Sequence, residues 1–148
     1  MNDQPIKMLL VEDDEDDYVI VLEHLCHVPS RKFDLEWICT YPEAVVEIAK
    51  KRHDIYIFDY RLGLDNGIDL IGEAKARGCT APIIMLTRYC DRFLEHKARA
   101  AGATDFLLKS AANAATLEAA ILKALGQTLP PAALSTPPPL QPPPQIQP

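Results

Sequence analysis

The sequence lacks the features of an exported or membrane-spanning protein. No apolar run in its 148 residues is long enough to cross a bilayer. The first residues, Met1-Asn2-Asp3-Gln4-Pro5, contain no basic segment followed by a hydrophobic one, which an export signal would require. We therefore expect a cytoplasmic protein without membrane attachment.

The cysteines are widely spaced, and their spacing offers neither a disulfide framework nor a zinc site. The four cysteines form no CxxC pair, and no histidine stands at metal-ligand spacing from them. Reduced thiols are the expected state in a cytoplasmic protein. Two catalytic signatures are also absent, because the chain has no Ser-His-Asp order and no glycine-rich phosphate loop.

The charge balance argues against general nucleic-acid binding, because the formal net charge is -6. The chain length fits one domain with a full hydrophobic core. Beyond Gly126 the composition changes, since prolines dominate and charged residues disappear. We predict a globular domain over residues 1–126 and a proline-rich tail over residues 127–148 that is extended or disordered.

Short apolar runs alternate with helical patterns along the domain. The runs predict five strands, and an amphipathic helical pattern follows each of them. This alternation predicts an α/β fold, in which a five-stranded parallel sheet of order 2-1-3-4-5 carries helices on both faces. The strands are predicted at residues 6–11, 33–39, 55–59, 82–87 and 104–108.

Polar side chains follow the strands that this order makes neighbours. Strands one, three, four and five would lie side by side, about 4.8 Å apart. Because the carboxyl ends of parallel strands meet at one edge of a sheet, we expect one pocket there. The residues at these ends are Glu12, Asp13 and Asp14, then Asp59, Thr87 and Lys109.

The chemistry of such a pocket follows from its charges. The carboxylates of Asp13, Asp14 and Asp59 would repel one another unless a cation joined them. Oxygen ligands that leave room for water suit Mg²⁺ better than zinc. Asp59 could then act as a nucleophile toward a phosphoryl group, whose oxygens would be shared by Mg²⁺, Lys109 and Thr87.

The set Asp13-Asp14, Asp59, Thr87 and Lys109 resembles the receiver domain of two-component response regulators, over about residues 6 to 125. The resemblance implies the flavodoxin-like receiver fold. It also implies that Asp59 accepts phosphate from a phosphohistidine on a sensor histidine kinase or a histidine phosphotransfer protein, and that Thr87 and Lys109 bind this phosphate.

The resemblance further implies a metal site and a switch. Mg²⁺ would be held by Asp13, Asp14 and Asp59, with the backbone carbonyl of Arg61 as a further ligand. The switch would couple Thr87 to the ring of Phe106, which follows the threonine hydroxyl inward and remodels the surface of helix four, strand five and helix five. Phe106 as an ordinary core residue is an equal alternative.

Three positions depart from the family pattern. Arg88 follows Thr87 where receivers usually carry a small residue, and it could crowd the site, add a cation to the phosphate or extend into water. Arg61 occupies a position that tunes water access, so we expect it to alter the lifetime of the aspartyl phosphate. Ser110 replaces the usual proline after Lys109, so the loop either keeps a costly cis peptide or turns another way.

The leading interpretation is a stand-alone receiver, because no DNA-binding or enzymatic domain follows the last helix. Its output would be phosphorelay transfer, dimerisation or partner docking, and it would catalyse only its own phosphorylation and dephosphorylation. A phosphatase of the haloacid dehalogenase type is disfavoured, because Arg61 stands where a second acid is needed. A degenerate receiver that binds partners without phosphorylation stays open because of Arg88 and Ser110.

Overall fold

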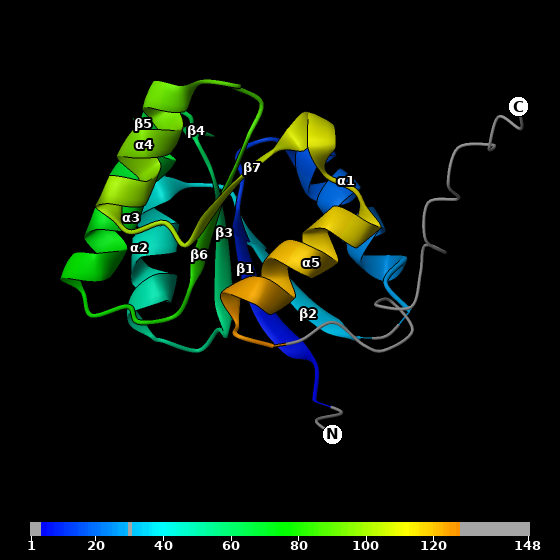
Figure 1. Cartoon of the computed structure of the whole chain (residues 1–148). Helices are drawn as coiled ribbons and strands as arrows, with labels where there is room; N and C mark the ends of the chain where they lie inside the picture. Colours follow the sequence, from blue (N-terminus) through cyan, green and yellow to red (C-terminus); the bar gives the residue numbers. More distant parts are fainter. Residues whose placement is uncertain (1–3, 30, 128–148) are drawn as a thin grey trace, which may run out of the picture.

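The computed structural model describes residues 4–29 and 31–127 of the chain. Its main sheet contains five parallel strands in the order β2-β1-β3-β6-β7, as Figure 1 shows. This result confirms the predicted fold class and the predicted order 2-1-3-4-5, because β6 and β7 are the fourth and fifth strands of this sheet. The strands are β1 (Ile6–Val11), β2 (Phe33–Ile38), β3 (Ile55–Asp59), β6 (Ile83–Thr87) and β7 (Asp105–Leu108).

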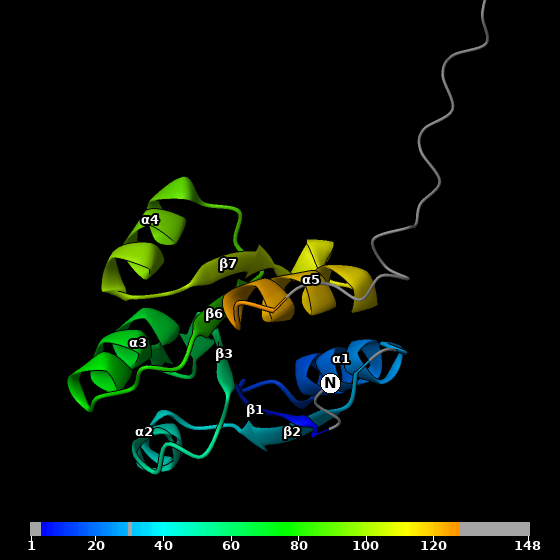
Figure 2. The ribbon, with the colours of Figure 1, turned by 60° about the horizontal axis from the view of Figure 1, so that its bottom comes forward.

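Two groups of helices cover the two faces of the sheet (Figure 2). α1 (Glu15–Cys26) and α5 (Ala114–Ala124) pack on one face. α2 (Tyr41–Ala49), α3 (Gly67–Ala76) and α4 (Arg92–Ala101) pack on the other. No helix in the described part of the chain combines the length and apolar character needed to cross a bilayer.

The central strands are buried on both faces, which explains their nearly continuous apolar sequence. Every residue of β3 and β6 is buried. Successive side chains of a strand point to opposite faces. Ile57 accordingly packs against α1 and α5, whereas its neighbour Phe58 packs against α2, α3 and α4. The groups at the carboxyl edge therefore stand on strands that are packed on both faces.

Each α-helix begins at a residue whose side chain accepts a hydrogen bond from the first helical turn, as N-cap residues do. These caps fix where the helices leave the carboxyl edge of the sheet. They are Asp14 for α1, Thr40 for α2, Asn66 for α3, Asp91 for α4 and Asn113 for α5.

A small hairpin after β3 was not predicted. β4 (Arg61–Leu62) and β5 (Asp65–Asn66) pair antiparallel in the stretch where the sequence indicated only a glycine-rich loop. Gly67 then starts α3, and its backbone N–H donates to the Tyr60 carbonyl at 2.7 Å. A Cβ at this position would collide with the Asp59 carbonyl oxygen, so glycine is required for the chain to turn back over Asp59.

The predicted boundary of the domain stays a prediction. All of the proline-rich tail beyond Gln127, residues 128–148, lies outside the described residues. The loop in which Ser110 replaces proline forms a single 3-10 turn, η1 (Lys109–Ala111).

Candidate functional site

Asp59 ends β3 between β1 and β6, and its side chain is 10% exposed. The Nζ of Lys109, which directly follows β7, lies 3.2 Å from the Asp59 Oδ2. The same Nζ donates a hydrogen bond of 2.8 Å to Glu12 Oε2, directly after β1. Three strand ends that are far apart in the sequence therefore meet at one point, as predicted from the strand order.

Three carboxylates form an oxygen cluster at this point. Glu12, Asp13 and Asp59 each offer an oxygen that lies within 4.8 Å of the other two. Asp13 is oriented by the hairpin, since its Oδ2 accepts a hydrogen bond of 3.0 Å from the Gly63 backbone N–H. An oxygen-only set of this kind fits Mg²⁺.

The structure places Asp14, a predicted metal ligand, outside this cluster. Its Oδ1 accepts the backbone N–H of Asp16 at 2.9 Å, because Asp14 caps α1. Glu12 instead continues the register of β1, since its N–H bonds to the Ile38 carbonyl at 3.0 Å, and its side chain is fully buried. The geometry therefore favours Glu12 and Asp13 as the acidic pair, one position earlier than the sequence prediction.

The predicted phosphate-binding and switch residues lie on the neighbouring strands. Thr87 ends β6, is fully buried, and accepts a hydrogen bond of 3.2 Å from the Tyr89 backbone N–H. Phe106 lies on β7 opposite Met85, is half-buried, and packs against the core on the α2, α3 and α4 side. The positions suit their predicted roles, which stay predictions.

Asp17 is a site residue that the sequence reasoning missed. Its Oδ2 accepts two charged hydrogen bonds, one of 2.7 Å from Lys109 Nζ and one of 2.6 Å from Arg88 Nη2. No role was predicted for this residue from the sequence. A signal was present, because Asp17 stands four and eight residues before Val21 and Leu25, which form the buried stripe of α1.

Burial raises the pKa of two carboxyl groups in the cluster, those of Glu12 and Asp59. Burial raises the pKa of Glu12 to about 8, although the hydrogen bond from Lys109 opposes this shift, and the nearby charge of Asp59 adds to it. Burial also raises the pKa of Asp59, against the attraction of Lys109. A bound cation would stabilise both ionised carboxylates.

Asp17 shows the opposite shift. Burial alone would raise its pKa, but the hydrogen bonds from Lys109 and Arg88 outweigh burial and hold the pKa below its ordinary value. Asp17 is therefore a fixed negative charge beside Lys109.

A pocket of 370 Å³ opens above the cluster. Asp59 and the acids after β1 line it, and Arg61, Arg88 and Tyr89 line it as well. The Arg61 guanidinium lies 6.0 Å from the centroid of the Tyr89 ring. Since a water molecule occupies about 30 Å³ in the liquid, the pocket has room for a hydrated cation and a phosphoryl group.

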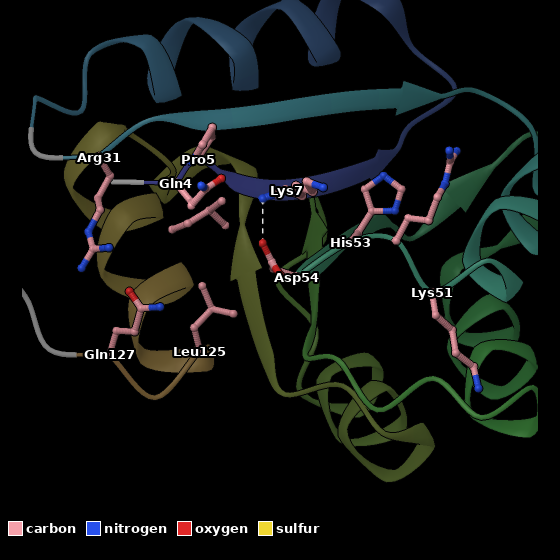
Figure 3. A pocket seen from close by; sticks show the side chains of 11 residues that line it. Gln4, Pro5, Lys7, Arg31, Lys51, His53, Asp54, Leu125 and Gln127 are labelled. Carbon is pink, nitrogen blue, oxygen red and sulfur yellow. Dashed lines mark hydrogen bonds between the residues drawn. The ribbon is translucent and has the colours of Figure 1, made fainter. Parts of the chain in front are cut away.

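A second pocket, of 440 Å³, lies at the opposite end of the sheet (Figure 3). Most of its charged lining residues are basic, and Asp54 is the one acid among the described residues that line it. Asp54 already accepts the Lys7 backbone N–H at 2.9 Å, drawn as a dashed line in Figure 3. His53 is likewise engaged, because its Nε2 lies 2.8 Å from a Glu36 carboxylate oxygen. This pocket therefore offers no counterpart of the Asp59 cluster.

Comparison with known proteins identifies the family. The family model described as the response regulator receiver domain matches residues 8–122, and the chain belongs to this family. A curated relative, the two-component response regulator PhoP of Pseudomonas aeruginosa, is 28% identical over 105 residues. The match covers 70% of this chain but 45% of PhoP, so the chain spans less than half of that relative.

Solved structures of receivers share the fold. A CheY-like response regulator receiver domain protein from Methanospirillum hungatei has a TM-score of 0.72 at 22% identity, over 83% of this chain and 95% of its own. The receiver domain of a sensor histidine kinase from Pseudomonas aeruginosa has a TM-score of 0.73 at 23% identity, over 84% of this chain and 100% of its own. In that second structure a magnesium ion is coordinated in the active-site cleft.

Proposed function

We propose that the chain receives a phosphoryl group on Asp59 from a phosphohistidine donor. One observation carries this proposal: the Asp59 carboxylate lies with two other carboxylates within 4.8 Å and with the Lys109 ammonium at 3.2 Å. This arrangement would bring a nucleophile, a cation site and the positive charge of Lys109 together. Membership of the receiver family supports a sensor histidine kinase or a histidine phosphotransfer protein in the cytoplasm as the donor.

In the proposed reaction, an oxygen of Asp59 attacks the phosphorus of the donor. The new P–O bond forms as the P–N bond breaks, and the leaving imidazole takes up a proton. Lys109 would bind a phosphoryl oxygen, and Thr87 would donate its hydroxyl proton to another. The chain would catalyse only its own phosphorylation and dephosphorylation.

Glu12, Asp13 and Asp59 would hold Mg²⁺, with the Arg61 backbone carbonyl as the further predicted ligand. When bound, the ion supplies positive charge to the phosphoryl oxygens. The magnesium ion in the cleft of the related receiver supports this assignment. Arg61 also lines the pocket beside the ring of Tyr89, which supports the prediction that it tunes water access to the aspartyl phosphate.

The output would be a change of the surface formed by α4, β7 and α5. Thr87 and Phe106 lie on adjacent strands, so a movement of the hydroxyl toward phosphate would leave space for the ring to follow. Phe93 on α4 is 69% exposed and offers an apolar contact for a partner protein or for a second copy of the chain. Phosphorylation would act by stabilising one of two packings of this surface.

Phosphorylation with acetyl phosphate and Mg²⁺, followed by intact mass measurement, tests the proposal. Wild type should gain one phosphoryl group, and Asp59→Asn should gain none. Asp34→Asn, which changes an exposed aspartate on β2, is the matched control and should behave as wild type.

The second candidate is a phosphorylation-independent binding module. The contact of Arg88 with Asp17 and Asp14 beside the pocket favours it, because a basic side chain restricts the approach of a donor. Failure of the wild type to gain phosphate, while a control receiver is modified, would support this candidate and contradict the first.

A further inference from the structure

Asp17, Lys109 and Arg88 form a connected set of charges beside the phosphoacceptor. The Oδ2 of Asp17 receives both cations, Lys109 Nζ at 2.7 Å and Arg88 Nη2 at 2.6 Å. The side chains of Asp17 and Lys109 are 10% and 14% exposed, so the contact between these two is largely shielded from water and is stronger than a surface ion pair.

The distances show where Lys109 is held in the unmodified chain. Its Nζ is within 2.8 Å of oxygens of both Asp17 and Glu12, but 3.2 Å from Asp59. The ammonium has three donors, and the carboxylates of Glu12, Asp17 and Asp59 already surround it. A phosphoryl group on Asp59 would therefore compete with Asp17 for one of these donors.

Arg88 could move from the carboxylates of Asp17 and Asp14 to a phosphoryl group on Asp59 at a small cost in free energy. Both of its contacts with carboxylates, to Asp17 and to Asp14, use Nη2, and its side chain is 59% exposed. Arg88 and Asp59 line the same pocket. A phosphoryl group adds up to about two negative charges and three acceptor oxygens, so it attracts the guanidinium more strongly than one carboxylate does.

We propose that Asp17 is a resting anchor for both cations: it holds Lys109 and Arg88 while Asp59 is unmodified, and phosphorylation draws them from Asp17 to the phosphoryl oxygens. Arg88 is then a second phosphate-binding cation, and Asp17 is a positioning residue that sets the strength of phosphate binding. This inference rests on the proposed function of Asp59.

The test is a titration of the full chain with beryllofluoride, a phosphoryl mimic, in the presence of Mg²⁺. The single tryptophan, Trp37, reports on the site, because its Nε1 donates to the Glu12 carbonyl at 2.7 Å. Asp17→Asn removes the competing carboxylate and should tighten binding about tenfold, the order of one charge-assisted hydrogen bond. Arg88→Ala should weaken binding by a similar factor.

Three further variants separate the anchor from a general effect of charge or folding. Asp16→Asn removes an exposed charge from the same turn of α1 and should match wild type. Asp17→Glu keeps the charge and should return the affinity toward wild type. When Arg88→Ala is already present, adding Asp17→Asn should increase the affinity for beryllofluoride by a smaller factor. Lys109 is then the one cation that the loss of the Asp17 carboxylate releases.

The lifetime of the aspartyl phosphate, followed by intact mass, gives a second readout. Asp17→Asn should lengthen it, and Arg88→Ala should shorten it. If wild type takes phosphate but Asp17→Asn and Arg88→Ala bind the mimic as wild type does, the anchor is wrong and the proposed function stands. If wild type neither takes phosphate nor binds the mimic, the proposed function fails, and the anchor fails with it.

Discussion

Glu12 is completely buried and has two charged neighbours, Lys109 and Asp59. Its carboxylate binds Lys109 and lies beside Asp59, and burial raises its pKa to about 8. The unfolded chain releases this proton near pH 4.5, so the folded chain binds more protons between these two values. The stability that the protonated Glu12 contributes is complete below pH 4.5 and is lost as the pH rises through about 8.

We expect the thermal stability of the metal-free protein to fall as the pH rises across this window. Melting in a chelator at several pH values measures the effect, and Glu12→Gln should flatten the dependence. Added Mg²⁺ should restore stability at the upper end, because the ion offsets the repulsion between carboxylates. Glu23→Gln, an exposed acid on α1, is the control that should keep the slope of wild type. If the melting temperature of Glu12→Gln depended on pH as steeply as that of wild type, Glu12 would not be the cause of the pH dependence.

Site residues were predictable from the sequence where a single polar residue marks the end of a buried strand. They were less predictable in the run of acids that follows β1. Asp59, Thr87 and Lys109 were found from the sequence because each stands at or directly after the end of a buried strand. The structure brings Glu12 and Asp13 to Asp59, one residue earlier than the predicted pair Asp13 and Asp14, since consecutive acids do not reveal where a strand stops. The helix cap at Asp14 was the missing constraint, because a capping carboxylate is committed to the first turn.

Among the elements, the β4–β5 hairpin and the start of α3 position the loop after Asp59. Strands of two residues are too short for any periodicity, so the sequence indicated only turns there. The requirement for glycine at residue 67 also depends on a contact with the backbone of Asp59, which a local pattern does not contain.

Two glycines of α3 give a matched pair of variants. Gly67→Ala should lower the free energy of unfolding by about 1–3 kcal/mol, because the added methyl group meets the Asp59 carbonyl. Gly72→Ala should raise it by about 0.5–1 kcal/mol, because residue 72 is an exposed helical position with open space around its Cβ. Urea unfolding of both variants checks the pair. Equal stabilities would contradict the close approach at residue 67.

For the molecule as a whole, the strand order was predictable because two independent arguments favoured the same order. Right-handed crossovers leave few orders for five parallel strands, and the polar groups at four strand ends favoured the order that makes those strands neighbours. Burial follows the same order, since β3 and β6 are fully buried whereas the edge strands β2 and β7 are not.

Hydrogen exchange should therefore be slowest in the middle of the sheet. We expect the amides of β3 and β6 to exchange only through global unfolding, and those of β2 to exchange earlier through local opening. Mass spectrometry of exchanged peptides measures this directly. Equal protection of β2 and β3 would show that the sheet opens as a single unit.

The hydrogen bond between Glu12 and Lys109 joins residues 97 positions apart. While the chain is being made on the ribosome, Asp59 is present long before its lysine has left the exit tunnel. A nascent chain that ends before β7 has the acidic residues but lacks the cation beside them. The phosphate uptake that we propose should thus arise late in synthesis, so half-made chains would not take up phosphate.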